Sequence, residues 1–351
     1  MTLSEVFFIT LSVLFVVSSV KCETLDNVAY SRYGSCRTHK PSDDDRIKTH
    51  AQLAVPIMGT DKPKGYLGTV GIVGGSVEQI GAAYFAAMTA LRIGADAVHI
   101  FCTRLAGPPL QAMSPDIIVH PLHDVNVEFL ITKLNTMDVV ILGPGLDKEP
   151  HSTNTIIPRV VLACKTLKKP LVVDLDPYFL TQAILNQFLK YPAPGVVMTV
   201  NSDEFEIIYK MIKTAGSYSE AHLSLDFDKL GENFMVYRKG CTDMAVSHNS
   251  ASSWSLAEGG SPRRSAGQGH MIAGATGIYY YWAVNTLPTN LTTANGPMFP
   301  AAMATYYAAK MMRAANRAAF MERGRSAITT DMLNKVQEVL YGSTNLMEDN
   351  N

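Results

Sequence analysis

The stretch GGSPRRSAGQGHMIAGATGIYYYWA, Gly259 to Ala283, joins a glycine-rich loop to an apolar segment that contains no proline. This pattern predicts a loop that leads into a buried helix. The first N–H groups of a helix lack intrahelical partners, and the helix dipole favours an anion in front of them. Glycines such as Gly267 and Gly269 allow a ligand to approach the backbone closely. The stretch therefore indicates an oxyanion or phosphate cradle, and the alternative is an ordinary turn before a buried helix without a ligand.

Upstream of this stretch, short apolar segments alternate with helical segments. The segments are apolar on both faces, which is typical of parallel strands covered by helices on both sides. Right-handed crossovers then give a doubly wound α/β/α sandwich, the fold class we expect. The expected strands are 67–73, 97–102, 116–119, 138–142, 171–174 and 196–199, and the expected helices are 81–93, 127–134, 153–167, 178–189 and 203–212.

After Leu230 the pattern changes to consecutive short strands with turn residues between them. These strands, at 233–237, 244–248 and 252–256, predict a β-meander at one edge of a mainly parallel sheet. Two further helices are expected at 300–323 and 329–341. The predicted organisation is a signal peptide over 1–22, a polar arm over 23–49, one α/β domain over 50–342 and a flexible tail over 343–351.

Composition limits the classes of partner. The chain has 351 residues, 47% of them hydrophobic, a net charge of −1 and five cysteines. Such a charge does not favour a nucleic-acid surface, and the cysteines are too sparse for a disulfide framework. We expect small-molecule substrates, no nucleic-acid partner and no stable membrane span once the signal is removed. A homo-oligomer is left open.

The segment Val6 to Val20 is an apolar run of the length found in secretory signal peptides. It predicts cleavage near Ser19 to Cys22 and a location in the secretory pathway, either in the lumen of the endoplasmic reticulum or outside the cell. The sequence Asn290-Leu291-Thr292 is a glycosylation sequon that would be usable there. Because the first residues include Glu5 and no Lys or Arg, an uncleaved anchor and a mitochondrial or cytoplasmic location remain alternatives.

Small or polar residues follow several of the expected strands. They are Gly74-Gly75-Ser76, Gly143-Pro144-Gly145, Asp174 with Asp176, and Asn201 with Glu204. Since ligands of open α/β sheets collect at the carboxyl ends of the strands, we expect these residues to share one cleft. Lys239, Arg263 and Arg264 are either phosphate contacts in that cleft or surface charges.

Taken together, these motifs resemble the ATP-dependent (S)-NAD(P)H-hydrate dehydratases, which have the ribokinase-like fold. The resemblance covers about residues 50 to 341. It depends on the ordered matches Lys64-Gly65, Gly74-Gly75-Ser76, Gly81-Ala82, Ser114-Pro115, Gly143-Pro144-Gly145-Leu146, Asp174 with Asp176, Asn201 with Glu204-Phe205, Lys239-Gly240 and Gly259 to Gly269.

The resemblance implies an enzyme that repairs hydrated NADH or NADPH. ATP, accompanied by Mg²⁺, phosphorylates the hydroxyl of the damaged nicotinamide ring, and phosphate then leaves. The hydrate-binding residues it implies are Gly145, Asn201, Ser202, Asp203, Glu204, Phe205, Glu206, Ile207 and His270. The ATP-binding residues it implies are Lys239, Gly240, Cys241, Thr242, Asp243, Gly260, Ser261, Pro262, Arg263, Arg264, Ser265, Ala266, Gly267, Gln268 and Gly269. The catalytic residues it implies are His270, Gly267 and Gly269, and the metal ligands are left unassigned.

One departure from the family pattern falls at the predicted base. The residue that ends the glycine motif is an Asp in the family, where it takes the proton of the attacking hydroxyl, and here it is His270. A neutral imidazole can accept a proton, but it is longer and differently aimed than a carboxylate. Asp147, which follows the GPGL motif, is a second departure. The alternative to a dehydratase is therefore a catalytically impaired relative that only binds nucleotide or a partner.

Overall fold

The structure is a computed structural model that describes residue 47 and residues 52–122, 127–149, 151–212 and 228–348. These residues all belong to one compact unit, Pro41–Asn351. The predicted signal peptide, most of the polar arm and the residues Cys22 and Cys36 lie outside the described part, so the domain boundaries stay predictions. Within the described part, no helix is both long and apolar enough to cross a membrane.

A nine-stranded sheet forms the centre of the unit, in the order β3-β2-β1-β4-β5-β6-β7-β8-β9. Neighbouring strands are parallel from β3 through to β7, whereas β7, β8 and β9 pair antiparallel. The mainly parallel sheet with a meander at one edge is confirmed. The strands are Thr69–Val73 (β1), Ala97–Thr103 (β2), Ile117–Leu122 (β3), Val139–Leu142 (β4), Leu171–Val173 (β5), Val196–Val200 (β6), Phe234–Arg238 (β7), Asp243–Ser247 (β8) and Trp254–Leu256 (β9).

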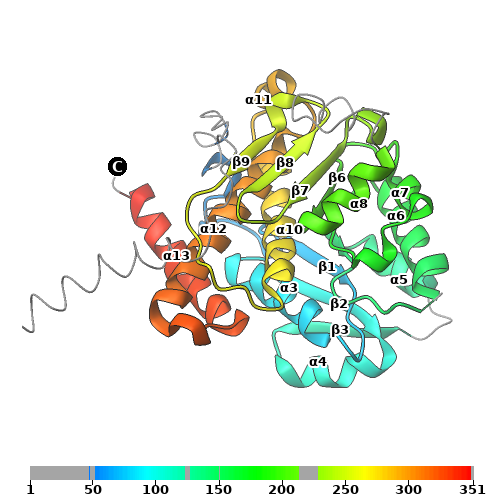
Figure 1. Ribbon diagram of the computed structural model, residues 1–351, viewed down its shortest axis with the longest axis horizontal. Helices are drawn as coiled ribbons and strands as arrows, with labels where there is room; N and C mark the ends of the chain where they lie inside the picture. The colour runs from blue at the N-terminus through cyan, green and yellow to red at the C-terminus, as the bar shows by residue number, and fades with distance from the viewer. Residues whose placement is uncertain (1–46, 48–51, 123–126, 150, 213–227, 349–351) are drawn as a thin grey trace, which may run out of the picture. The chain divides into compact units, whose positions relative to one another are not determined.

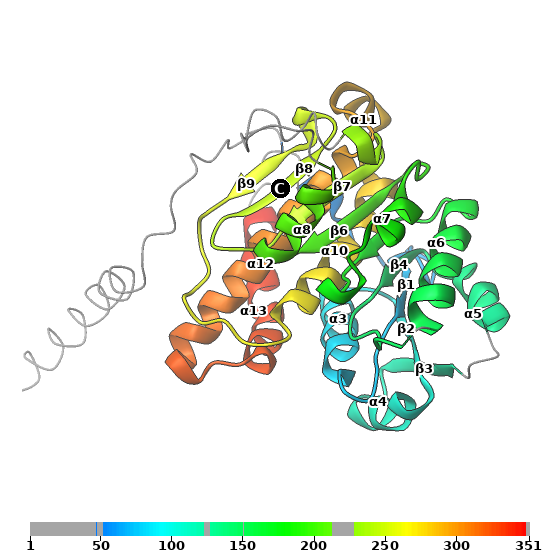
Figure 2. The same ribbon diagram turned by 45° about the vertical axis from the view of Figure 1, so that its right-hand side comes forward.

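Helices cover both faces of the sheet, as Figures 1 and 2 show. Successive strand residues point to opposite faces, so Ile141 joins the core under one helical layer and Val140 joins the core under the other. This is the expected α/β/α sandwich. One layer contains Ile80–Ile93 (α3), Gln268–Thr286 (α10), Phe299–Arg323 (α12) and Thr329–Glu348 (α13); the other contains Val127–Leu134 (α5), Ile157–Thr166 (α6), Gln182–Phe188 (α7) and Ser202–Ile212 (α8).

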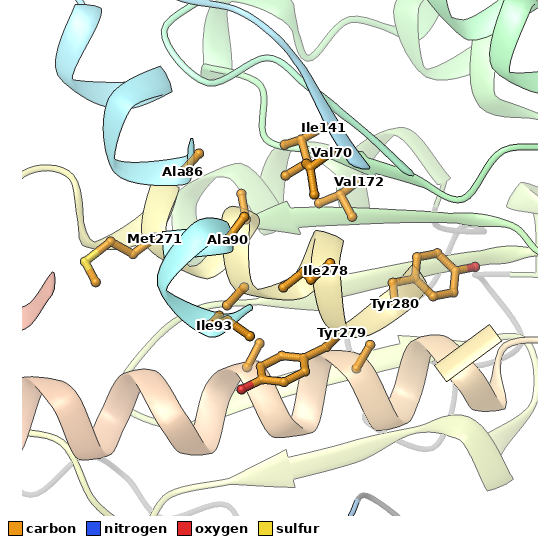
Figure 3. Packing of buried hydrophobic residues seen from close by; sticks show 14 of the residues in the cluster. Val70, Ala86, Ala90, Ile93, Ile141, Val172, Met271, Ile278, Tyr279 and Tyr280 are labelled. Carbon is orange, nitrogen blue, oxygen red and sulfur yellow. The ribbon is translucent and has the colours of Figure 1, made fainter. Parts of the chain in front are cut away.

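Helix α10 is buried along most of its length. It packs between α3, α12 and the sheet, where Ile278 lies near Val70, Ile141 and Val172 (Figure 3). A helix that is apolar on all sides is stable only when it is enclosed in this way. The hydroxyl of Tyr280 donates to the carbonyl oxygen of Pro194 at 2.6 Å, so its polar atom is satisfied. The core therefore fixes the helix whose first turn faces the cleft described below.

Two tryptophans, both buried, anchor different parts of the sheet. Trp282 in α10 donates its indole N–H to the carbonyl oxygen of Leu67, just before β1, at 2.7 Å. Trp254 in β9 donates to Thr305 Oγ1 in α12 at 3.0 Å and packs against Tyr237. One indole thus lies beside the parallel part of the sheet and the other within its antiparallel edge.

The structure differs from the sequence-based expectation in some local elements. Two short helices were not expected: Gly107–Met113 (α4) and Thr289–Asn295 (α11). Helix α4 begins with Gly107, Pro108 and Pro109, which usually mark turns, but proline fits the first turn of a helix because its missing N–H would have no partner there. Helix α11 begins directly after Pro288. The expected helix 178–189 is instead a 3₁₀ turn followed by α7, which begins where Thr181 Oγ1 accepts the Ile184 N–H at 3.3 Å.

Candidate functional site

A cleft of about 690 Å³ lies at the carboxyl ends of β4, β5 and β6 and continues beneath the start of α10. The glycine loop after β4 forms part of its wall. Gly145 has a φ of +69°, and a Cβ there would lie 2.3 Å from the carbonyl oxygen of Gln79. Only glycine fits such a backbone against such a neighbour. Gly75 N–H donates to the Pro144 carbonyl oxygen at 2.9 Å, so the loops after β1 and β4 are joined directly.

The start of α8 forms a second wall of the cleft. Asn201 Oδ1 accepts the backbone N–H of Glu204 at 2.9 Å, and Glu204 Oε2 accepts the backbone N–H of Asn201 at 2.7 Å. This reciprocal pair is a capping box, in which each side chain satisfies a free donor of the helix terminus. Burial raises the pKa of Glu204, although its bond to the Asn201 N–H and the Lys239 charge oppose that shift. The box sets the angle at which α8 enters the cleft.

Arg313 of α12 holds together the loops on the opposite side of the cleft. Its Nε donates to Asp243 Oδ2 at 2.9 Å, and its other nitrogens donate to the carbonyl oxygens of Gly240, Cys241, Leu256 and Gly259. Both side chains of the ion pair are buried, with exposed fractions of 10% and 6%. Burial raises the pKa of Asp243, while Arg313 opposes that shift. One buried guanidinium thus joins the turn after β7 to the loop that precedes α10.

The first turn of α10 closes the cleft. Gly267 has a φ of +97°, and a Cβ there would lie 2.7 Å from Phe85 Cδ2, so the residue must be glycine. Its carbonyl oxygen accepts the N–H groups of His270 and Met271 at 3.1 and 3.2 Å. The N–H groups of Gln268 and Gly269 come too early in the helix to have a carbonyl one turn before them. These two donors are the ones that suit an anion.

The carboxylate of Asp174, directly after β5, lies at the centre of the site. Its Oδ1 accepts from Lys239 Nζ at 2.8 Å and from Thr199 Oγ1 at 2.9 Å, and its Oδ2 lies 2.7 Å from Nδ1 of His270. Burial alone would raise the pKa of Asp174. The charge of Lys239, the interaction with the His270 ring and the hydrogen bonds from both outweigh burial, so the pKa lies well below its usual range. The carboxylate is therefore ionised at neutral pH.

Most of the site residues expected from the sequence come together in this cleft. Those that line it are Gly145, Asn201, Ser202, Asp203, Glu204, Lys239, Gly240, Cys241, Asp243, Gly260, Ser261, Arg264, Ser265, Gln268, Gly269 and His270. Those placed in the same segments without lining it are Phe205, Glu206, Ile207, Thr242, Pro262, Arg263, Ala266 and Gly267. Cys241 is disulfide-bonded, while Cys102 and Cys164 are buried free thiols. The binding and catalytic roles of these residues stay predictions.

Some residues of the cleft were not among the expected site residues. The sequence places Asp174 at the end of a strand. It does not show the contact of Asp174 with His270, because the two residues are 96 positions apart in the chain. Arg313 and Asn316 come from α12 and line the cleft as well. Their spacing of three residues on a helix that is otherwise rich in alanine and methionine is the signal that could have identified them.

A second cavity, of about 560 Å³, adjoins the first, and Gln79 and Leu146 line both. It is formed by the loops after β1, β2 and β4 and includes Arg104, Lys148 and Asp147. The Asp147 carboxylate accepts a hydrogen bond from the Ser152 hydroxyl, so it is engaged within its own loop. The departure from the family pattern at this position therefore has a local structural role.

Comparisons with solved structures identify the fold. A ribokinase-like superfamily protein from Enterococcus faecalis superposes with a TM-score of 0.62 at 16% identity, covering 83% of this chain and 94% of that protein. An ADP/ATP-dependent NAD(P)H-hydrate dehydratase from Bacillus subtilis, co-crystallised with ATP and Mg²⁺, superposes with a TM-score of 0.53 at 16% identity, covering 83% and 96%. These likenesses confirm the ribokinase-like fold.

Sequence comparisons identify the family. The ATP-dependent (S)-NAD(P)H-hydrate dehydratase of Aedes aegypti is 34% identical over 291 residues, which are 82% of each chain. The protein of the same name from Drosophila melanogaster is 36% identical over 290 residues, covering 82% of this chain and 90% of that one. The sequence profile of the NAD(P)H-hydrate dehydratases matches residues 70–338. The chain belongs to the NAD(P)H-hydrate dehydratase family.

Proposed function

We propose that this protein is an ATP-dependent (S)-NAD(P)H-hydrate dehydratase, a lyase that restores NADH or NADPH from the hydrated form. The observation that carries the proposal is the arrangement of one cleft. The free N–H groups at the start of α10, the Lys239 ammonium and the imidazole of His270 all meet there. Donors for a phosphoryl group and a proton acceptor for an alcohol are the groups that phosphoryl transfer needs.

The two substrates would occupy opposite walls. ATP suits the wall made by the turn after β7 and the loop before α10, where Arg264 and the N–H groups of Gln268 and Gly269 favour phosphates. The hydrated dinucleotide suits the wall made by Gly145 and the start of α8. The adjoining second cavity supports this assignment, because a dinucleotide is long and would extend beyond the first cavity.

The reaction would proceed in two stages. The ring hydroxyl gives its proton to His270 while its oxygen bonds to the γ-phosphorus of ATP, and the bond from that phosphorus to ADP breaks. Phosphate then leaves with the bonding pair of its C–O bond, and the neighbouring ring carbon loses a proton, whose bonding pair forms the restored double bond. Phosphoryl transfer depends mainly on positioning and on charge stabilisation, and the fixed donors of α10 supply both without rearrangement.

Mg²⁺ would accompany ATP and neutralise charge on its phosphates. Protein sites usually bind this ion through one or two carboxylates together with the phosphates of the substrate. The carboxylates of Asp203 and Glu204 at the start of α8 line the cleft and are oxygen donors of this kind. Among the residues that the structure describes, no group of three or more His, Cys, Asp or Glu side chains could hold a metal ion. The two carboxylates of Asp203 and Glu204, together with the phosphates of ATP, would suit an ion that arrives with the nucleotide.

The alternative of a catalytically impaired relative gains no support. The relatives reported above are named as dehydratases, and His270 faces the cleft from the first turn of α10 with a carboxylate beside its ring. Histidine paired with a carboxylate is an effective general base in other enzymes. The replacement of the family Asp therefore changes the chemical identity of the base without removing a base from the site.

Turnover of the purified full-length protein with ATP, Mg²⁺ and hydrated NADH tests the proposal, with the returning NADH absorbance as the readout. The native protein should restore NADH only when ATP is present. His270→Ala should lose about 10²- to 10⁴-fold in kcat, the usual contribution of a general base. His270→Asp, which restores the family residue, should keep more activity than His270→Ala. The proposal fails if the native protein binds ATP and restores no NADH.

We also propose that the protein enters the secretory pathway, on the basis of the apolar run Val6 to Val20. Asn290, in the sequon, is exposed in α11 and would be accessible to a glycosyltransferase. Expression of the full chain in cells that glycosylate secreted proteins should give a form whose mobility increases after removal of N-glycans. Asn290→Gln should abolish that shift. A native chain that carries no glycan and stays in the cytoplasm or enters mitochondria would contradict this location.

A further inference from the structure

We infer that Asp174 is a positioning residue for the base of this enzyme: it holds His270 in the tautomer that carries the proton on Nδ1, so that Nε2 is the atom that accepts the substrate proton. The role of Nε2 in proton transfer rests on the proposed function. The tautomer itself does not, because it follows from contacts within the protein. The imidazole and the carboxylate together would thus replace the single carboxylate that the family resemblance implies at position 270.

The contacts of Asp174 leave one assignment for the ring. An ionised carboxylate only accepts hydrogen bonds, and Oδ2 of Asp174 lies 2.7 Å from Nδ1 of His270. Nδ1 must therefore be the donor. A neutral imidazole with its proton on Nδ1 has a lone pair on Nε2 and can accept a proton there. Asp174 thus determines which nitrogen of His270 is basic.

The charge on Asp174 is maintained by its other partners. Lys239 Nζ and Thr199 Oγ1 both donate to Oδ1, and His270 is bonded to Oδ2. Both oxygens of the carboxylate therefore have partners, although only 6% of the side chain is exposed. The ammonium and the imidazole together lower the pKa of Asp174 despite its burial. A buried carboxylate with these partners stays ionised and keeps its acceptor role toward the ring.

The orientation of the ring is also fixed from the backbone. The N–H of His270 is bonded to the carbonyl oxygen of Gly267, which places the residue in the first turn of α10. Its side chain is 30% exposed and lines the cleft. With Nδ1 tied to the buried Asp174, Nε2 is on the ring edge away from that carboxylate. The geometry therefore presents the basic nitrogen to the same cleft as the anion-binding N–H groups.

The groups in this arrangement can accept the proton of the substrate hydroxyl and release the leaving group. The ring hydroxyl of the substrate loses its proton to Nε2 as its oxygen forms the bond to the γ-phosphorus of ATP, and the bonding pair of the broken P–O bond leaves with ADP. The resulting imidazolium is paired with the Asp174 carboxylate, which stabilises its charge. After the products leave, the imidazolium gives its proton to solvent. The carboxylate stays ionised throughout and never carries the proton.

Nitrogen NMR of full-length protein labelled with ¹⁵N-histidine tests the tautomer directly, because the two ring nitrogens differ in shift according to which one is protonated. The signal of His270 is identified by its loss in His270→Gln. The native protein should show protonated Nδ1 at a pH where the ring is neutral. Asp174→Asn should shift the ring toward protonated Nε2, since the amide nitrogen can donate to Nδ1. A native ring with its proton on Nε2 would overturn the inference, even if the Asn variant fails to fold.

The control is Thr199→Val, which removes a hydrogen bond from the same carboxylate without touching the ring. It should leave the His270 tautomer unchanged. In turnover assays Asp174→Asn should lower kcat by at least about 10²-fold while changing the KM for ATP by less than about threefold. An Asn variant that folds and keeps the native kcat would also overturn the inference. If the native protein restores no NADH, the proposed function fails, and the NMR result still decides the tautomer.

Discussion

Replacement of Arg313 by methionine should destabilise the protein strongly. The substitution keeps an unbranched apolar stem but removes the guanidinium that pairs with Asp243, whose side chain is only 6% exposed. Removal of one member of a buried ion pair typically costs about 3–5 kcal/mol, because the other charge stays buried without a partner. Four backbone carbonyl oxygens also lose their donors. We therefore expect a loss of free energy of unfolding near the upper end of that range.

Urea unfolding of the full-length protein measures this effect as a fall in the midpoint at constant slope. Lys310→Met is the matched control, because Lys310 is an exposed residue of the same helix and its replacement should stay within about 0.5 kcal/mol of the native value. The double variant Arg313→Met with Asp243→Asn should recover part of the loss, since it leaves no buried charge. A loss below about 1 kcal/mol for Arg313→Met alone would show that the pair does not hold these loops.

Two further substitutions test the site at other points. Gly267→Ala should cost about 1–2 kcal/mol in unfolding free energy and weaken ATP binding in calorimetry, because the residue has a φ of +97° and its Cβ would lie 2.7 Å from Phe85. Gly81→Ala, whose Cβ would come no closer than 3.8 Å to Phe85, should be neutral or stabilising, and equal effects of the two would contradict this reasoning. In the folded protein the pKa of Asp174 lies well below its usual value of 3.8. Ionised Asp174 therefore stabilises the fold at pH values above 3.8, and this stabilisation is lost as the pH falls from 3.8 toward the lower pKa. Acid unfolding followed by circular dichroism should therefore be less steep in Asp174→Asn, and identical pH profiles would refute the linkage.

The layers of the fold were predictable because the patterns that specify them are local. Strands such as 138–142 are short, apolar on both faces and followed by glycine or aspartate, and the structure places β4 at Val139–Leu142. The helix predicted at 127–134 has the same bounds in the structure. By contrast, α11 consists of residues with modest helix propensity, and its packing beside α12 decides its conformation. A conformation that depends on packing against another helix is difficult to predict from the sequence of a short segment.

The site was predictable in outline for the same reason. The carboxyl ends of parallel strands meet at one edge, so Gly145, Asn201 and Asp174 could be placed together from the strand pattern alone. The partners of those residues could not, because they depend on segments far away in the chain. Arg313 reaches Asp243 across 70 positions, and nothing in the sequence of α12 specifies which carboxylate it meets. The interaction of His270 with Asp174 likewise became visible only in three dimensions.

The placement of the two indoles gives the protein built-in fluorescent reporters at separate places. Emission from Trp282 follows the environment beside β1, and emission from Trp254 follows the edge strand against α12. With Trp282→Phe and Trp254→Phe, each reporter can be observed alone during denaturation. Coincident transitions would mean that the whole sheet melts as one cooperative unit, and an earlier transition at Trp254 would mean that the antiparallel edge detaches first. Since that edge carries the turn proposed to hold ATP, an earlier transition would make nucleotide affinity the first property lost on warming.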